Sequence, residues 1–413
     1  MTTDRKDFAI ELEERFGARN YLPLPVVLTR GEGVWLWDAD GRRYLDMMSA
    51  YSAVSFGHSH PRLLDALCAQ AARLAVTSRA FHTDVLGPFL RELCEATGMD
   101  RALPMNTGAE AVETAIKAAR KWGYRVKGIP EGRAQIICAH GNFAGRTTTI
   151  VSFSSEPQYR DGFGPLTPGF VSVPFGDAAA LEAAITPHTA AFLVEPVQGE
   201  AGIIVPPAGY LRAAREICTR RNVLLICDEV QTGLGRTGRL LACAHENVRP
   251  DGLTLGKALG GGLLPVSAFL AREDVMAVFR PGDHGSTFGG NPLAAAVGRE
   301  ALRLLHDERL AERAAASGAD LLARLREIDH PAVREVRGKG LLIGLDLDPA
   351  VVSARRFCEA LMRRGVLSKE THETVVRLAP PLTIEREQIG QAVQAIEAVL
   401  QTIPRSAPVP ETV

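Results

Sequence analysis

The sequence lacks an excess of charge of either sign, since 47 Lys and Arg residues face 48 Asp and Glu residues over 413 positions. Nucleic-acid-binding proteins carry a basic excess or stripe, so nucleic acid is not an expected partner. The seven cysteines form no CxxC pair, which argues against a disulfide framework or a zinc knuckle and favours a reducing compartment. We expect no metal site.

Long hydrophobic runs are also missing. No apolar stretch approaches the roughly 20 residues of a membrane helix. The N-terminal segment MTTDRKDFAIELEERFG mixes acids and bases, unlike an ordinary signal peptide. These absences favour a cytoplasmic protein that does not enter a membrane.

The chain is too long for one simple core, and a prior of about 150 residues per domain predicts two or three units. Short apolar runs alternate with amphipathic stretches from about residue 60, which is typical of an α/β sheet covered by helices. We expect a large α/β domain with a mostly parallel central sheet, plus a smaller α+β domain built from both chain ends. The predicted division is an N-terminal segment (1–59), a large domain (60–300), a small C-terminal domain (301–403) and a disordered tail (404–413).

Several elements can be placed from the pattern. Residues 33–50 read as a hairpin, residues 293–327 as one long helical stretch, and GKGLLIGLDLD (338–348) as a strand. The apolar runs expected as strands of the large domain are AQIICA (134–139), AAFLVEP (190–196), VLLICDE (223–229) and LPVSAFLA (264–271).

The run VLLICDE ends on two acids, Asp228 and Glu229, although carboxylates are rarely buried without a partner. Asp228 would lie at the carboxyl edge of a central strand, where open α/β sheets bind ligands. A cation there would pair with it, and the pyridinium nitrogen of pyridoxal phosphate is such a cation. The alternative is a strand-end acid that caps the next turn or meets an arginine.

Lys257 follows a short apolar run and precedes the glycine cluster 260–262, which permits close approach by a flat ligand. Desolvation in such a pocket lowers the pKa of an amine, so Lys257 is a candidate for Schiff-base formation. Simple exposure is the alternative for a lysine considered alone.

A phosphate site is indicated at the start of the predicted helix GAEAVETAIKAARKWG. Thr107 would be its N-cap and Glu110 the capping-box partner. The backbone N–H groups of Gly108 and Ala109 would then bind an anion, which the helix dipole favours. Many helices begin in this way and bind nothing.

Three glycine-rich segments invite other interpretations. GLGRTG (233–238) fits a dinucleotide-binding pattern, but its first glycine does not directly follow the strand. LTLGKALGGG (253–262) fails as a phosphate loop because Lys257 is followed by Ala258 in place of Ser or Thr. GSTFGGNP (285–292) offers the hydroxyls of Ser286 and Thr287 to a phosphate, or forms an ordinary turn.

The lysine, the aspartate and the phosphate helix together resemble a fold-type I pyridoxal phosphate enzyme. More narrowly, the chain resembles the class III (omega) aminotransferases, and among them the branch that acts on ornithine. The resemblance covers about residues 17 to 400 and is carried by these blocks: NYLPLPV, SAYSAVSFGHSHP, TSRAFH, LPMNTGAEAVETA, GNFAGRT, VEPVQGEAGI, DEVQTGLGRTG, LGKALGGG, HGSTFGGNP, VRGKGL and VRLAPPL.

The resemblance implies roles at the cofactor. Lys257 would hold pyridoxal phosphate and later carry a proton, and Asp228 would pair with the pyridine nitrogen. Phe143 would stack on the ring and Gln231 would bond its hydroxyl. The phosphate would be held by residues of both subunits of a homodimer: Gly108 and Ala109 of one, with Ser286 and Thr287 of its neighbour.

The resemblance also implies the substrates, L-ornithine as donor and 2-oxoglutarate as acceptor. Tyr21 and Arg146 would hold the α-amino and α-carboxylate groups of ornithine, and Tyr51 would shape the pocket for it. Arg377 would bind the α-carboxylate of 2-oxoglutarate, while Glu200 would cover this arginine during the ornithine half-reaction. A purely structural ion pair between Glu200 and Arg377 is the alternative.

One position departs from the family pattern. Ala144 stands where relatives commonly carry a bulky aromatic residue or histidine, so the range of donors stays open. The same chemistry could use N-acetylornithine or 4-aminobutyrate as donor. A nicotinamide oxidoreductase based on GLGRTG and a non-catalytic, regulatory relative are the alternatives from other classes.

Overall fold

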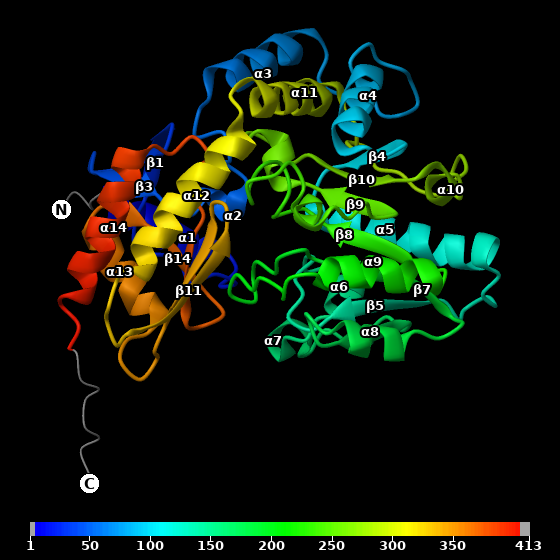
Figure 1. Cartoon of the computed structure of the whole chain (residues 1–413). Helices are drawn as coiled ribbons and strands as arrows, with labels where there is room; N and C mark the ends of the chain where they lie inside the picture. Colours follow the sequence, from blue (N-terminus) through cyan, green and yellow to red (C-terminus); the bar gives the residue numbers. More distant parts are fainter. Residues whose placement is uncertain (1–4, 405–413) are drawn as a thin grey trace.

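The structure, a computed structural model, describes residues 5–404. Figure 1 shows one body around a large sheet, flanked by a second body that contains both the blue N-terminal and the orange C-terminal segments. Residues 405–413, most of the predicted disordered tail, lie outside the described residues. Within the described part, no helix has the length and apolarity that crossing a membrane requires.

The large body is built on a seven-stranded sheet with the order β4-β10-β9-β8-β7-β5-β6. β6, β5, β7, β8 and β9 run parallel to one another, whereas β10 is antiparallel to both β9 and β4. This confirms the mostly parallel sheet. The strands are β4 (Arg101–Met105), β5 (Gln135–Ala139), β6 (Phe170–Val173), β7 (Thr189–Val194), β8 (Leu224–Asp228), β9 (Gly252–Leu255) and β10 (Ser267–Ala271).

Helices cover both faces of this sheet, which explains why β8 is apolar at successive positions. Leu224 and Ile226 of β8 pack in the cluster that contains α5, while Leu225 and Cys227 pack in the cluster that contains α9. The helices and helical turns of this body are α3 (Pro61–Arg73), α4 (Leu86–Thr97), α5 (Gly108–Trp122), η1 (Gly123–Lys127), α6 (Thr148–Val151), α7 (Pro157–Arg160), α8 (Ala178–Ala184), α9 (Tyr210–Arg220), η2 (Ala242–Glu246), η3 (Lys257–Gly260), α10 (Glu273–Met276) and α11 (Pro292–Asp307).

The second body holds two four-stranded sheets, β1-β2-β3-β13 and β11-β12-β15-β14. The predicted hairpin is confirmed as β2 and β3, and β3 pairs in parallel with β13 from the other end of the chain. The elements are α1 (Arg5–Phe16), β1 (Leu28–Glu32), β2 (Trp35–Asp38), β3 (Arg43–Asp46), α2 (Ser49–Ser52), α12 (Leu310–Arg326), β11 (Val333–Lys339), β12 (Leu342–Leu347), α13 (Ala354–Arg363), β13 (Val366–Leu367), β14 (Lys369–Thr371), β15 (Val375–Leu378) and α14 (Arg386–Leu400).

Two predicted elements are wrong in detail. The helical stretch 293–327 is two helices, because Arg309 adopts a left-handed conformation with φ 51°. α11 packs on α3 and α4, whereas α12 packs on β11 and α14, so the break lets the chain pass between bodies. The predicted strand 338–348 is the turn and second strand of a hairpin, because Gly340 reverses the chain with φ 56°. The predicted domain boundary at residue 300 falls inside α11.

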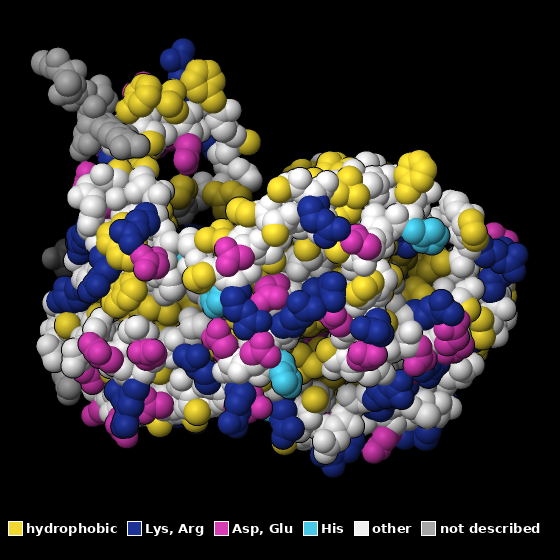
Figure 2. Space-filling model, turned by 90° about the horizontal axis from the view of Figure 1, so that it is seen from above, with side chains coloured by type: hydrophobic (Ala, Val, Ile, Leu, Met, Phe, Trp, Pro, Cys, Tyr) yellow, Lys and Arg dark blue, Asp and Glu magenta, His cyan; other side chains and the backbone are white. Residues whose placement is uncertain are grey.

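The surface agrees with the balanced composition. Figure 2 shows basic and acidic side chains interspersed over the face seen from above. Such mixing leaves no broad field of one sign on this face.

The GLGRTG segment is a turn that ties the two bodies together. Arg236 is fully buried and donates hydrogen bonds to the carbonyl oxygens of Leu341 and Pro380 and to Oγ of Ser55. Burial lowers its pKa to about 9. This buried side chain explains why a glycine-rich segment at this place does not act as a nucleotide loop.

We predict that Arg236→Met lowers the free energy of unfolding by about 3 kcal/mol, because two buried carbonyl groups and a hydroxyl lose a charged donor. Chemical denaturation followed by circular dichroism measures this change. Arg239→Met is the matched control, since Arg239 is exposed in the same turn. Equal stability of the two variants would contradict the structural role of Arg236.

Candidate active site

A cavity of about 180 Å³ lies at the carboxyl edge of the large sheet. Parallel strands bring the residues that follow them to one edge, and here the segments after β4, β5, β7, β8 and β9 supply the walls. The residues that line the cavity are Gly108, Ala109, Phe143, Ala144, Gly145, Glu195, Glu200, Asp228, Val230, Gln231 and Lys257. All sequence-predicted cofactor residues of the chain except Ser286 and Thr287 are therefore brought together.

The two acids after β8 have different surroundings. Oδ1 of Asp228 accepts hydrogen bonds from the backbone N–H of Val230 (3.1 Å) and from Oγ1 of Thr254 (3.0 Å). Burial raises the pKa of Asp228, against the effect of these bonds, so a cation at the cavity would stabilise its charged form. The Glu229 carboxylate instead accepts a hydrogen bond from the backbone N–H of Cys243 at 2.8 Å, so its partner belongs to the protein itself.

Lys257 begins the helical turn η3 directly after β9, with a left-handed backbone at φ 44°. A left-handed conformation is strained for a side chain with Cβ, and such strain is found at functional sites. Burial lowers the pKa of Lys257, an effect that the nearby carboxylates Glu200 and Asp228 partly offset. The amine is thereby closer to its neutral, nucleophilic form than an exposed lysine.

The start of α5 has the capping box that the sequence predicts. Oγ1 of Thr107 accepts the backbone N–H of Glu110, and the Glu110 carboxylate accepts the backbone N–H of Thr107 at 2.8 Å. A Cβ at Gly108 would lie 2.8 Å from Cγ1 of Val230, so the close packing here requires glycine. The N–H groups of Gly108 and Ala109 thus face the cavity at the positive end of the helix dipole.

Sequence reasoning missed Glu195. This residue follows β7 and lines the cavity, where its carboxylate accepts the backbone N–H of Phe143 at 3.0 Å. Burial and the nearby Asp228 raise the pKa of Glu195 to about 8. The sequence offered a signal for Glu195, because in AAFLVEP this acid directly follows the apolar run, just as Asp228 does in VLLICDE.

An ion pair closes the other end of the cavity. Nη2 of Arg377 donates to Oε2 of Glu200 at 2.7 Å, and the Arg377 side chain is only 1% exposed. Burial alone would raise the pKa of Glu200, but the charge and hydrogen bond of Arg377 bring it below its ordinary value. Nη1 of Arg377 is buried without a hydrogen-bond partner among residues 5–404, so a further acceptor can bind there.

Tyr51 reaches Arg377 through an unusual turn. Four consecutive residues, 49–52, adopt left-handed conformations, with φ 59° at Tyr51. The Arg377 guanidinium carbon lies 5.0 Å from the centre of the Tyr51 ring, within the range of a cation–π contact. The turn therefore places an aromatic wall beside the ion pair.

The remaining predicted residues do not line the cavity of the single chain. Tyr21 is 72% exposed, and the Arg146 guanidinium carbon lies over the Tyr159 ring, 3.5 Å from its centre. Oγ of Ser286 accepts Nδ2 of Asn106 at 2.8 Å, and Thr287 follows in the same segment.

The cavity fits pyridoxal phosphate by its unsatisfied groups. Oδ2 of Asp228 receives no hydrogen bond from the described residues, which leaves it for a pyridinium N–H. Nε2 of Gln231 donates to Glu200, while its Oε1 is buried and unpartnered in the described part of the chain, as suits a ring hydroxyl. Phe143 supplies a flat wall, and the amides of Gly108 and Ala109 supply an anion site.

Comparisons with known proteins agree with this site. The family described as "Aminotransferase class-III" matches residues 16–400. An ornithine aminotransferase of Exiguobacterium sp. is 57% identical over 391 residues, 95% of this chain and 97% of the relative.

Among solved structures, an ornithine aminotransferase from Toxoplasma gondii, described with partial occupancy of PLP at its active site, has a TM-score of 0.95. It is 47% identical, over 96% of this chain and 94% of that one. An acetylornithine aminotransferase from Elizabethkingia anophelis has a TM-score of 0.88 and 48% identity, over 97% of this chain and 100% of that one. The chain therefore belongs to the class III aminotransferase family.

Proposed function

We propose that the protein is a pyridoxal phosphate-dependent aminotransferase that moves the δ-amino group of L-ornithine to 2-oxoglutarate. The products are glutamate-5-semialdehyde and L-glutamate, formed in a ping-pong reaction. The observation that carries the proposal is one cavity lined by Lys257, Asp228 and Glu200, the carboxylate that pairs with the buried Arg377. The high identity to a relative named for ornithine supports the choice of donor.

Pyridoxal phosphate, when bound, supplies an electron sink that acidifies the C–H bond beside the reacting amine. Nζ of Lys257 would bind the cofactor and, when free, would hold and return the proton of the substrate carbon. The Asp228 carboxylate would hold a proton at the pyridine nitrogen. Asp228 is buried and Lys257 is partly buried, which limits the contact of both side chains with water.

Other residues orient the cofactor. The Phe143 ring would lie against the pyridine, and Oε1 of Gln231 would accept a hydrogen bond from the ring hydroxyl. The N–H groups of Gly108 and Ala109 would hold the phosphate at the start of α5. A fixed ring position is needed because proton transfer requires hydrogen-bond distances.

Arg377 and Glu200 control which substrate carboxylate binds in each half-reaction. While Glu200 covers the guanidinium, a donor cannot bind Arg377 by its α-carboxylate, and its terminal amine reaches the reaction site. When 2-oxoglutarate binds, its carboxylate displaces Glu200 and takes the two-pronged contact with Arg377. Tyr21 and Arg146 hold the α-amino and α-carboxylate groups of ornithine, with Tyr51 shaping the pocket.

We expect Arg377→Ala to raise KM for 2-oxoglutarate about 30-fold, because a charged hydrogen bond of roughly 2 kcal/mol is lost. The rate of the half-reaction with L-ornithine should change by less than about threefold, because ornithine does not bind Arg377 in the proposed reaction. Stopped-flow absorbance of the two half-reactions separates these effects. If both half-reactions fell equally and stability fell with them, the ion pair would be structural only.

A second donor has a specific observation in its favour. The acetylornithine aminotransferase of Elizabethkingia anophelis is as similar in sequence to this chain as the ornithine enzyme of Toxoplasma gondii. Ala144 leaves more room beside the ring, which would suit an acylated or different terminal amine such as 4-aminobutyrate. Steady-state kcat/KM for L-ornithine, N-acetylornithine and 4-aminobutyrate decides, and a clear preference for N-acetylornithine would overturn the choice of ornithine.

We further propose a homodimer in which Ser286 and Thr287 complete the phosphate site of the neighbouring subunit. Phe288, next to them, is 56% exposed in the single chain, as expected for a contact surface that a second subunit covers. The cytoplasmic location stays a prediction.

Mixed dimers test this arrangement. We expect Lys257→Ala and the double variant Ser286→Ala/Thr287→Ala each to be inactive or nearly so at limiting cofactor. A hybrid dimer of the two contains one site with every residue intact, so it should regain about half of the wild-type activity per dimer. No recovery in purified hybrids would show that the hydroxyls act within their own subunit.

A further inference from the structure

A second cavity lies at the opposite end of β8 from the candidate active site. Its volume is about 480 Å³, against about 180 Å³ for the active-site cavity. Leu224 lines this second cavity and Asp228 lines the first, so four residue steps along β8, roughly 13 Å, separate them. The second cavity is therefore distinct from the chemistry described above.

Three arginines from separate segments line this cavity. Arg215 comes from α9, Arg249 precedes β9 and Arg272 follows β10. Asp251 is the one carboxylate in the lining, which leaves the wall with more positive than negative groups. Guanidinium groups bind carboxylates and phosphates in a two-pronged geometry, so the lining is suited to an anion.

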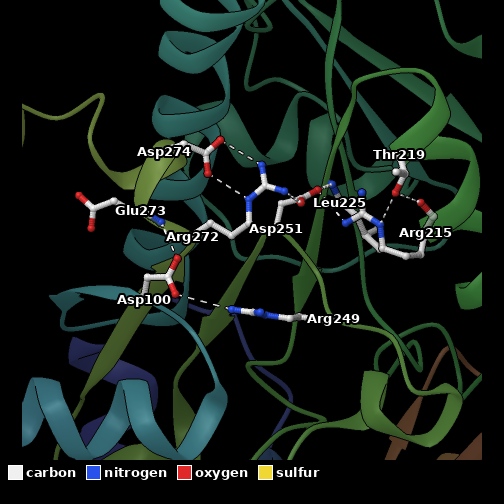
Figure 3. A network of polar contacts seen from close by, with 9 residues as sticks. All are labelled: Asp100, Arg215, Thr219, Leu225, Arg249, Asp251, Arg272, Glu273 and Asp274. Atoms are coloured by element: carbon white, nitrogen blue, oxygen red, sulfur yellow. Dashed lines mark hydrogen bonds and ion pairs between the residues drawn. The ribbon is translucent and has the colours of Figure 1, made fainter.

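Figure 3 shows that Asp251 lies between two of these arginines and holds them in place. Its carboxylate accepts Nη1 of Arg215 at 2.8 Å, Nη1 of Arg272, and the backbone N–H of Leu225 at 2.7 Å. Arg215 also donates Nε–H to Thr219, so the fold uses two of the five N–H groups of its guanidinium. The fixed guanidinium retains donors for a ligand, and this preorganisation favours binding.

Two acids at the rim compete for the arginines. Asp274 pairs with Arg272 at 3.0 Å, and Asp100 lies 3.6 Å from Arg249. The side chains of Asp274 and Asp100 are 51% and 45% exposed, so solvent screens both pairs and they contribute little. An anion inside the cavity can therefore replace these two acids as the partner of Arg272 and Arg249 with only a small loss of free energy.

The rest of the wall is largely apolar. Trp122, Cys218, Val223, Leu224 and Pro250 line it. The indole N–H of Trp122 is buried and has no acceptor within residues 5–404. A ligand for this cavity thus has an apolar body in addition to its anionic group.

We propose that this cavity binds a small organic anion, with a carboxylate or phosphate on Arg215, Arg249 and Arg272 and its apolar part near Trp122. The volume is in the range of ligand sites in proteins. This inference goes beyond the proposed aminotransferase and does not depend on it. The competing explanation is a purely structural network that ties α9, β8 and β10 together.

Calorimetric titration of the enzyme saturated with pyridoxal phosphate tests the proposal, because saturation blocks the phosphate site at Gly108. Citrate is the carboxylate probe and ATP the phosphate probe, each against sodium chloride at equal ionic strength. We expect at least one probe to bind wild-type enzyme, and to bind Arg249→Ala about tenfold more weakly. Binding of citrate alone or of ATP alone identifies the anionic group, and binding of both shows that the arginines accept either.

Three further variants distinguish binding inside the cavity from nonspecific electrostatic attraction of the anion to the protein surface. Arg212→Ala removes an exposed arginine of α9 outside the lining and should bind as the wild type does. Thr219→Trp fills the cavity without removing a charge and should abolish binding, whereas Thr219→Val removes only the hydroxyl that accepts Nε–H of Arg215 and should keep it. No binding of either probe, or binding unchanged in Arg249→Ala and Thr219→Trp, overturns the proposal.

Discussion

Lys257→Ala is expected to lower kcat by about 10⁴-fold or more, because the variant loses both the amine that binds the cofactor and the base at the substrate carbon. The absorbance band of the lysine-bound cofactor should disappear at the same time. Rates with L-ornithine and 2-oxoglutarate, together with the ultraviolet-visible spectrum, measure the two effects. A nicotinamide oxidoreductase would show no such band in the wild-type protein.

Lys127→Ala is the matched control for this variant. Burial lowers the pKa of Lys127 as it does that of Lys257, but Nζ of Lys127 donates to the carbonyl oxygen of Thr189, far from the cavity lining. This variant should keep the spectrum and most of the activity. Turnover by Lys257→Ala within tenfold of the wild type would be incompatible with the proposed chemistry.

Asp228→Asn should lower kcat by about 10²- to 10³-fold while the cofactor still binds, because the amide keeps the shape of the carboxylate and removes its charge. Without that charge the pyridine nitrogen loses its proton, and the ring withdraws electrons less well. The half-reaction with L-ornithine, followed without any oxo acid, reports this step directly. A non-catalytic relative would fail to convert the cofactor even with Asp228 intact.

Glu229→Gln provides the comparison, since Glu229 is the adjacent buried acid and accepts hydrogen bonds from the 242–243 turn instead of lining the cavity. We expect this variant to lose stability and to keep the rate of the half-reaction in the protein that remains folded. Equal loss of rate in Asp228→Asn and Glu229→Gln would remove the distinction between the two acids.

Local signals predicted the cofactor side of the site. Asp228 ends an apolar run, Lys257 precedes a glycine cluster, and Thr107 with Glu110 marks a helix start, so each could be placed from a few neighbouring residues. The structure brings Asp228 and Lys257 to one cavity because β8 and β9 are adjacent and parallel. Short strands such as β6 and β9, with four residues each, carry too little pattern to be recognised.

Features that depend on contacts between residues distant in sequence could not be predicted from local sequence patterns. The left-handed turn that carries Tyr51 contains no glycine among residues 49–52, so nothing local marks it. The break at Arg309 depends on α11 and α12 packing on different bodies. Arg377 itself was assigned by resemblance to the family, because an arginine in a short apolar strand has no local signal for a partner 177 positions away.

Arg377 belongs to β15 in the second body, whereas Asp228 ends β8 of the large sheet and Lys257 begins η3, just after β9 of that sheet. In the proposed reaction, the residue that binds the acceptor and the residues that carry the chemistry are thus encoded in separate stretches of the polypeptide. Exchanging the segment around β14 and β15 with that of a relative should alter which keto acid is used. The absorbance band of the bound cofactor should stay unchanged. Substrate preference can therefore diverge in evolution through changes in this segment, while the residues proposed to bind the cofactor stay the same.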